Sequence, residues 1–184
     1  SINVENKDFE NLYKRNYKRS FLFAKSYVHD DLAAEDIVAE SLVKYWRVTS
    51  QENTEASDAL LLTILKHKSL DYLRHQAIHL TAIGNIADIN IREMNTRIST
   101  LEACNPSDIF SKEIRQIINK TLHSLPKQTR QIFYLSRFEN KSVKEIAEIT
   151  NITVKGVEYH ITKSLKVLRI ALKDYLPFLL FFIN

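Results

Sequence analysis

Few cysteines, glycines and prolines occur in this chain of 184 residues, which contains one, two and three of them respectively. The single cysteine, Cys104, excludes an intramolecular disulfide and with it the small secreted folds that depend on several disulfides. Alternating β-branched residues, which indicate strands, are also scarce. Since 45% of the residues are apolar, the chain has enough of them to form a core. The composition therefore predicts an all-α protein.

Long apolar segments and a strong charge imbalance are missing as well. Residues 1 to 20 mix basic residues with acids and show no signal peptide, which favours a cytoplasmic protein. Residues 177 to 184 form an apolar tail that is too short to cross a bilayer, which takes about 20 residues. We expect this tail to fold back or to be covered by a partner. A net charge of +4 at pH 7 fits a nucleic-acid partner but does not require one.

Two short helices joined by a tight turn are predicted between Ser142 and Lys173. Ser142 and Glu145 have the spacing of a capping box at the start of the first helix. Asn151 stands where the turn begins, and asparagine is the commonest substitute for glycine at positive φ. Thr153 is expected to cap the second helix. This pattern is typical of a helix-turn-helix.

The second of these helices has an apolar face and a basic face. The apolar side chains are Val154, Val157, Ile161, Leu165, Leu168 and Leu172. The other face carries Lys155, Tyr159, Thr162, Lys166, Arg169 and Lys173. A basic face suits an approach to DNA phosphates, although an ordinary solvated lysine face has the same pattern. Together with the capped first helix and the asparagine turn, it favours DNA binding.

Two amphipathic helices are predicted in the first third of the chain. Aromatic residues recur at three and four residue steps in residues 8 to 28, where they form core or, alternatively, a platform for stacked bases. The helix of residues 30 to 47 carries five acids and no lysine or arginine up to residue 43. Either these acids favour the helix dipole, or they face a partner with basic residues. Trp46, near the end of this helix, is an anchor or a core residue.

A polar loop, VTSQENTEASDA, separates the acidic helix from a second basic helix. This helix has the sequence LLLTILKHKSLDYLRHQ and carries Lys66, Lys68 and Arg74. Three histidines and one aspartate of this helix recur every four residues, and they are His67, Asp71, His75 and His79. This spacing on one helix face is one that metal ligands use. No cysteine and no second cluster accompany them, and histidines beside lysine and arginine equally suit phosphate or base. We therefore expect no metal.

Three blocks carry a resemblance to a known family. They are AEDIVAESLVKYW, LLTILKHKSLDYLR and LPKQTRQIFYLSRFENKSVKEIAEITNITVKGVEYHITKSLKVLR, in this order. Together they resemble the polymerase-binding, -10-binding and -35-binding parts of an extracytoplasmic-function (ECF) sigma factor. A helix-turn-helix alone is shared by many regulators, whereas the three blocks together are specific. The resemblance covers residues 8 to 76 and 107 to 174.

The resemblance implies roles for particular residues. The residues expected to dock on the largest subunit of RNA polymerase are Asp36, Ile37, Glu40 and Trp46. The residues expected at the melted -10 strand are Lys66, His67, Asp71 and Arg74, with Asn53 in a loop of residues 53 to 57 that captures a flipped base. The residues expected at the -35 element are Lys155, Glu158, Tyr159, Thr162 and Lys163, with Arg130 contacting the DNA backbone.

Four positions depart from the family pattern. His67 stands in place of the usual Asn, and Gly156 in place of a usual Thr. Gly156 lacks a hydroxyl and is a poor helix former, which argues against a phosphate contact there. Asn140 and Asn151 stand in place of usual glycines, and asparagine keeps the option of positive φ.

The predicted organisation is two small helical domains joined by a linker. The first domain covers residues 1 to 77, the linker 78 to 106, and the helix-turn-helix domain 107 to 176, before the tail. The linker lacks strong periodicity, but its isoleucines suggest that it docks somewhere or forms a short helix. In the family such a linker threads the RNA exit path of the polymerase.

The function expected from these features is transcription initiation by a factor that is not itself an enzyme. Its partners would be core RNA polymerase, promoter DNA and, by family resemblance, a membrane-linked anti-sigma factor, with no cofactor or small-molecule substrate. One alternative is a stand-alone helix-turn-helix regulator whose first domain senses a ligand or dimerises, and another is a helical protein-interaction module. The acidic helix followed by two basic helices favours the sigma factor.

Overall fold

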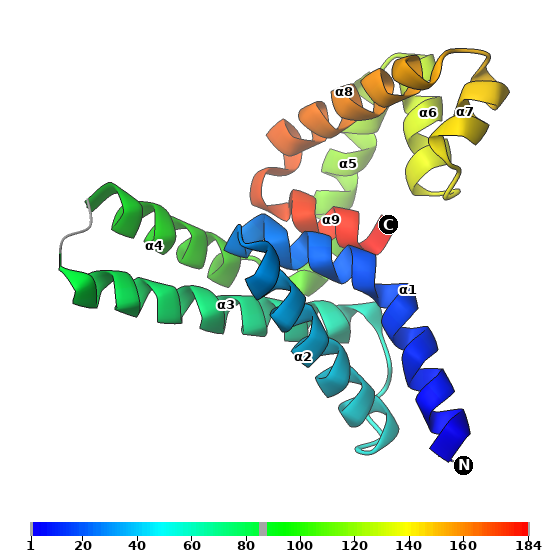
Figure 1. The fold of residues 1–184 in the computed structure, drawn as a ribbon. Coiled ribbons are helices and arrows are strands. Elements are labelled where there is room, and N and C mark those ends of the chain that lie inside the picture. Colours follow the sequence, from blue (N-terminus) through cyan, green and yellow to red (C-terminus); the bar gives the residue numbers. More distant parts are fainter. Residues whose placement is uncertain (1, 85–87, 184) are drawn as a thin grey trace. The chain divides into compact units, whose positions relative to one another are not determined.

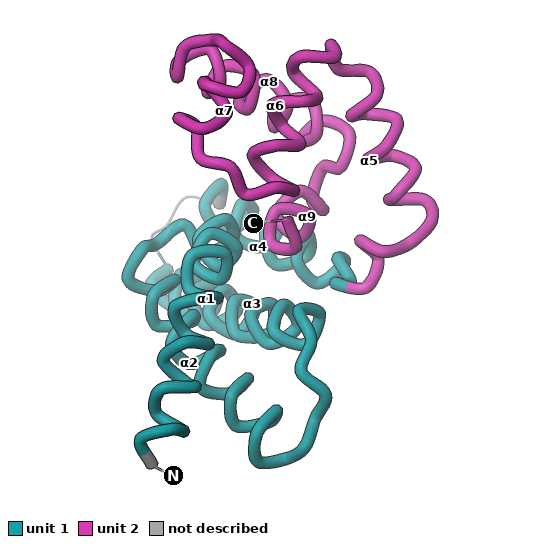
Figure 2. The backbone as a smooth tube through the Cα atoms, turned by 90° about the vertical axis from the view of Figure 1, so that its right-hand side faces the viewer, with its two compact units in different colours: residues 1–106 teal, residues 107–184 magenta. Residues whose placement is uncertain are grey.

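The computed structural model describes residues 2–84 and 88–183. Over these residues the chain forms α-helices and short 3-10 helices and no strand, so the predicted all-α class is confirmed (Figure 1). The chain divides into two compact units, residues 1–106 and residues 107–184 (Figure 2).

Long helices pack together in the first unit. They are α1 (Ile2–Val28), α2 (Asp31–Ser50), α3 (Asp58–Ile83) and α4 (Asp88–Ala103). The starts of α2 and α3 are capped, because Asp30 accepts a hydrogen bond from Ala33 N at 2.8 Å and Ser57 accepts one from Leu60 N at 3.1 Å. The largest side chains fully buried here are Phe23, Leu42, Leu61, Leu62, Leu65, Leu73 and Leu101. The caps and the buried leucines together explain why these segments are helical.

The structure differs from the predicted linker over residues 78 to 106. Helix α3 continues to Ile83 and ends at Gly84, whose φ of 72° suits glycine. Residues 85–87 lie outside the described residues, and α4 then runs back along α3 (Figure 1). Arg97 of α4 donates a hydrogen bond to Tyr27 O of α1 at 3.2 Å. The segment is thus mostly helix, and α4 packs within the first unit.

The apolar residues of α4 explain this difference. They recur at three and four residue steps and are Ile91, Met94, Ile98 and Leu101. Only the last is fully buried, while the other three are half-buried. Such a narrow stripe between polar residues gives a weak signal in the sequence but is enough for one helix to pack on another.

Shorter helices make up the second unit. They are η1 (Pro106–Phe110), α5 (Lys112–Ser124), α6 (Lys127–Arg137), α7 (Val143–Thr150), α8 (Val154–Leu172), η2 (Lys173–Tyr175) and α9 (Leu176–Ile183). A core cluster of Ile132, Ile146 and Val157 joins α6, α7 and α8. Five partly buried apolar side chains surround it, and they are Leu135, Val143, Ala147, Ile152 and Ile161. This cluster fixes the angle between the two helices of the helix-turn-helix.

The apolar tail forms a short helix that folds back within the second unit. Helix α8 ends before Lys173, whose φ of 49° turns the chain. The Tyr175 hydroxyl donates to an Asp108 carboxylate oxygen at 2.7 Å, and the rings of Phe110 and Phe182 lie 4.8 Å apart. These contacts hold η2 and α9 against η1. Among the described helices, none has both the length and the apolar character needed to cross a membrane.

Replacing Ile146 with Ala is expected to lower the free energy of unfolding of the second unit by about 2–5 kcal/mol, because the residue is fully buried in the core cluster. Hydrogen exchange of α7 and α8 amides in the full chain measures this loss. The matched control is Ile149→Ala on the same helix, where the side chain is 53% exposed and the expected change is within about 0.5 kcal/mol. Equal effects of the two changes would contradict the assigned core.

Candidate nucleic-acid and protein interfaces

The predicted caps and turn of the helix-turn-helix are present. Ser142 Oγ accepts a hydrogen bond from Glu145 N at 3.2 Å, and the Glu145 carboxylate accepts one from Ser142 N at 2.7 Å. Asn151 adopts φ 54° and ψ 43°, which is the left-handed conformation. Thr153 Oγ1 accepts a hydrogen bond from Gly156 N at 3.0 Å and so caps α8. The turn therefore positions the start of α8 rigidly.

The candidate base-reading residues share one face of α8, because they follow one another at three and four residue steps. Lys155, Glu158, Tyr159 and Thr162 are exposed, and Lys163 is half-buried. The opposite face carries the buried residues of the helix, which are Val157, Ser164, Leu168 and Leu172. Helix α8 therefore has one face in the core and one polar face free to enter a groove of DNA.

Packing explains why a glycine occupies position 156. A Cβ added there would come within 3.3 Å of the Ile152 and Thr153 side chains, which is a crowded distance. Glycine therefore lets the start of α8 lie close to the turn, and Thr153 fills the space that a side chain would need.

A hydrogen bond between α6 and α8 was not predicted from the sequence. Thr129 Oγ1 lies 2.8 Å from His160 Nδ1, and Thr129 is fully buried. Arg130, the candidate backbone contact, is the next residue on α6 and is half-buried. The sequence does not indicate this hydrogen bond, because Thr129 and His160 lie on different helices and 31 residues apart.

The acidic face of α2 has a composition different from the one predicted. Asp36 and Glu40 are exposed as expected, but Ile37 is only 6% exposed and belongs to the core. Ile37 points away from solvent because it follows Asp36 by one residue, which is about 100° around the helix. Trp46 is half-buried, and its ring lies 5.8 Å from that of Phe9 on α1. Ile37 is therefore unavailable to a partner, and Trp46 packs within the unit.

Two exposed apolar residues of α2 were missed. Leu32 is 74% exposed and Val43 is 53% exposed, and they lie on the same face as Asp36 and Glu40 at helical spacing. Glu40 also accepts a hydrogen bond from Lys68 of α3 at 3.3 Å. Apolar residues at three and four residue steps from the acids are the signal that would have identified this face. The result is a mixed acidic and apolar surface, which is typical of a protein interface.

Helix α4 holds two candidate DNA-binding groups of α3. Lys66 Nζ donates to Cys104 O at 2.5 Å and lies 3.4 Å from Glu102 O. Arg74 Nη2 donates to a Glu102 carboxylate oxygen at 2.8 Å. Carbonyls at the end of a helix and a carboxylate carry negative charge, as phosphates do. Lys66 thus has backbone carbonyls, and Arg74 a carboxylate, as partners within the protein.

The other two candidates on α3 are exposed. They are His67 and Asp71, and Asp71 lies 3.7 Å from Arg74 in an ion pair. His75 Nδ1 lies 3.2 Å from the backbone carbonyl of Asp71. Within the described residues, no group of three or more His, Cys, Asp or Glu is placed to hold a metal ion.

The loop between α2 and α3, residues 51–57, is exposed along its whole length. Asn53 has a φ of 52°, a left-handed conformation that asparagine tolerates. Thr54 N donates to Val48 O at 3.0 Å, which ties the loop to the end of α2. The loop presents polar side chains to solvent at a position fixed by its two flanking helices.

Comparison with known proteins gives a family match in each unit. Residues 12–78 match the family model for sigma-70 region 2, and residues 115–168 match the model for sigma-70 region 4. The chain is also similar to RNA polymerase sigma factor SigV of Bacillus subtilis (strain 168). The two are 28% identical over 158 residues, which cover 85% of this chain and 86% of that protein. The chain belongs to the ECF sigma factor family.

The two matched regions fall on different units of this ECF sigma factor. Region 2 covers α1 from residue 12 onward, α2 and most of α3, and region 4 covers most of α5, then α6 and α7, and most of α8. Its function is therefore promoter recognition for RNA polymerase. Helices α4 and α9 lie outside both matched ranges. The contacts of α4 with Lys66 and Arg74 are thus a feature of this chain that the matched ranges do not include.

Glu102→Gln in the sigma factor is expected to strengthen binding to single-stranded DNA by up to about fivefold, because an exposed ion pair contributes about 0.2–1 kcal/mol and its loss releases Arg74 for phosphate. Fluorescence anisotropy with a labelled oligonucleotide at low salt measures the affinity. Glu93→Gln is the matched control, since it removes the same charge from α4 but breaks only the pair with Arg97 on the same helix. If both variants gained equally, net charge alone would account for the effect.

Proposed function

We propose that three surfaces divide the work of promoter recognition. The acidic and apolar face of α2 docks on core RNA polymerase, α3 with the loop of residues 51–57 contacts the melted -10 strand, and α8 contacts the -35 element. The observation that carries this proposal is the exposed pair Asp36 and Glu40 between Leu32 and Val43. A DNA-binding regulator that acts alone has no need of such a surface, whereas a polymerase subunit does.

The docking of α2 would combine apolar burial with charge. Leu32 and Val43 would supply the apolar contact, because each exposes a large fraction of its side chain. Asp36 and Glu40 would pair with basic groups of the polymerase and fix the register. Glu40 would exchange its contact with Lys68, an exposed pair that costs little to break.

The -10 strand would be bound by cations and read by the loop. Lys66 and Arg74 would contact phosphates after leaving their partners on α4, and His67 and Asp71 would contact bases or sugars from the exposed side of α3. Asn53 would meet a flipped base with its amide, which both donates and accepts hydrogen bonds. The positive charge on α3 would also attract the phosphate backbone of the melted strand.

The -35 element would be read in the major groove by α8. Glu158 accepts hydrogen bonds and suits a cytosine amino group, while Lys155 and Lys163 suit guanine. Tyr159 and Thr162 offer hydroxyls between them. Arg130 would contact the DNA backbone from α6 and hold the helix in register. The capped turn supports this role because it presents the first turns of α8, the part that reaches bases in a helix-turn-helix.

The remaining proposals rest on the family. The protein acts without catalysis of its own, since the polymerase carries out the chemistry, and it works in the cytoplasm with core polymerase and promoter DNA. A membrane-linked anti-sigma factor holds it inactive until a signal arrives. Copurification with core polymerase and a run-off transcript from reconstituted holoenzyme test the central proposal. A protein that binds DNA but not the polymerase would be a stand-alone regulator.

The double change Asp36→Lys and Glu40→Lys is expected to abolish binding to core polymerase, because like charges at close range cost several kcal/mol. Pull-down with core polymerase measures the binding, and circular dichroism checks that the helices persist. Glu5→Lys with Asp8→Lys on α1 is the matched control, since both residues are exposed and the change in charge is the same. Wild-type binding by the α2 variant would refute the docking surface.

Lys163→Ala is expected to cost about 1–3 kcal/mol on a preferred -35 duplex and much less on a scrambled one, because it contacts bases. Arg130→Ala is expected to weaken both duplexes about equally and to reduce the dependence of binding on salt, because it contacts the backbone. Binding by holoenzyme to a duplex selected by the wild-type protein, and to its scrambled form, separates the two. Equal losses on both duplexes for Lys163→Ala would remove its base-reading role.

A further inference from the structure

Burial does not set the position of the loop of residues 51–57. Every residue from 51 to 58 is exposed, so no loop side chain is anchored in a core. The loop is held instead at its two ends. At the α2 end, Gln51 N donates to Arg47 O at 2.9 Å and Thr54 N to Val48 O at 3.0 Å. At the α3 end, Ser57 caps the helix, and Asp58 is the first residue after the loop.

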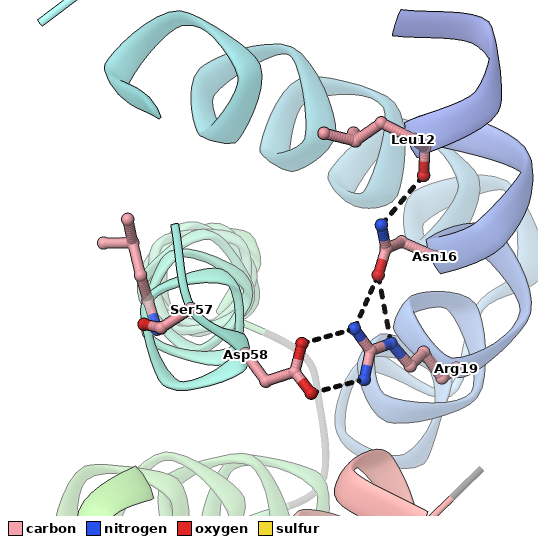
Figure 3. A network of polar contacts seen from close by, with 6 residues as sticks. Leu12, Asn16, Arg19, Ser57 and Asp58 are labelled. Carbon is pink, nitrogen blue, oxygen red and sulfur yellow. Dashed lines mark hydrogen bonds and ion pairs between the residues drawn. The ribbon is translucent and has the colours of Figure 1, made fainter. Parts of the chain in front are cut away.

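Asp58 is bound by Arg19 of α1. Arg19 Nη2 donates to Asp58 Oδ1 at 2.7 Å, and Arg19 Nη1 donates to Asp58 Oδ2 at 3.1 Å. Figure 3 shows the guanidinium lying between this carboxylate and the amide of Asn16. A bidentate pair of this kind fixes orientation as well as distance. It ties the end of the loop to α1, which lies 39 residues earlier in the chain.

The guanidinium is itself held from behind. Asn16 is 3% exposed, and its side-chain amide nitrogen donates to Leu12 O at 2.8 Å. Its oxygen therefore faces Arg19 and accepts hydrogen bonds from Nε at 3.1 Å and Nη2 at 2.6 Å. The Arg19 side chain is only 15% exposed. Arg19 thus has little freedom to move, and it transmits the position of α1 to Asp58.

The charge state of Asp58 suits this role. The hydrogen bond from Arg19 lowers the pKa of the Asp58 carboxyl, against a smaller opposing effect of burial. The carboxylate is therefore ionised at neutral pH. The contact it makes would weaken only when the pH falls through that lowered pKa.

We infer that Arg19 is a positioning residue for -10 recognition: through Asp58 it sets the place of the loop of residues 51–57, and so the base that the loop accepts. This inference rests on the proposed role of the loop. Base capture requires groups held within a fraction of an ångström, because a loosely held loop accepts several bases. The clamp of Asn16, Arg19 and Asp58 provides this rigidity where burial does not.

A salt bridge that only stabilises the packing of two helices should not affect -10 recognition. The chain contains such a pair, which serves as a control. Lys25 of α1 pairs with Asp31 at the start of α2, at 2.7 Å. This pair also joins two helices, but it stands at the opposite end of α2 from the loop, which is about 30 Å away for a helix of 20 residues. Lys25→Ala removes an inter-helix ion pair without touching the loop.

The test uses holoenzyme reconstituted from core polymerase and the full chain. Promoter templates are randomised over the -10 and -35 elements, and the transcribed templates are sequenced. Arg19→Lys keeps the charge but loses the bidentate fork, and Asp58→Asn keeps the shape but loses the charge. Each is expected to reduce the preference at a -10 base position by at least fivefold and to leave the -35 preferences unchanged. Lys25→Ala is expected to change neither.

The double variant Arg19→Lys with Asp58→Asn gives a further readout. Because the contact between Arg19 and Asp58 is the one that reaches the loop, the loss of -10 preference in the double variant should equal that of either single variant rather than their sum. Unchanged -10 preferences in both single variants would overturn the inference, as would an equal decline of -10 and -35 preferences.

Asn53→Ala separates this inference from the proposed function on which it rests. If Asn53→Ala flattens the -10 preference and Arg19→Lys does not, the loop reads DNA but Arg19 does not position it. If neither change affects the -10 preference, the loop has no role in reading and both proposals fail.

Discussion

The backbone N–H groups at the start of each helix need hydrogen-bond partners, and this need constrains where the helices begin. Each surface assigned to a partner lies on a helix whose first turn is capped in this way. The first turn of a helix leaves backbone donors without partners inside the helix, and a side chain from the residue before it can accept a hydrogen bond from one of them. Ser57 does this where the exposed loop meets α3, and Thr153 does it where the tight turn meets α8. Asn53 and Asn151 add the left-handed residue that each connection needs in a chain with two glycines.

Charge on α3 is balanced inside the protein before any DNA is present. Lys66 and Arg74 face the carbonyls and carboxylate at the end of α4, and Lys68 faces Glu40. The contacts of Arg74 and Lys68 are exposed and therefore weak in water, whereas that of Lys66 with Cys104 O is partly buried. If α3 binds the -10 strand as proposed, its affinity for DNA should depend on α4 as well.

Local patterns predicted the helices, their caps and the turn, but not contacts between distant residues. The capping box of Ser142 and the left-handed Asn151 are read within a few residues, and the structure has both. The partners of Lys66 and Asp58 lie 38 and 39 residues away, and no periodicity indicates them. Helix α4 was expected as a linker because its apolar stripe is narrow and only Leu101 is fully buried.

Neighbouring residues of α2 show why a functional face is harder to predict than a helix. Asp36 is exposed, while Ile37, one step of about 100° further, is buried. The family motif would place Asp36 and Ile37 in the same interface. In the helix, however, Asp36 faces solvent and Ile37 faces the core. In the proposed docking surface, Leu32 and Val43 would take the apolar role expected of Ile37, because they are exposed on the face of Asp36. It follows that substitutions at Ile37 should act on stability, whereas substitutions at Leu32 should act on binding and leave the fold intact.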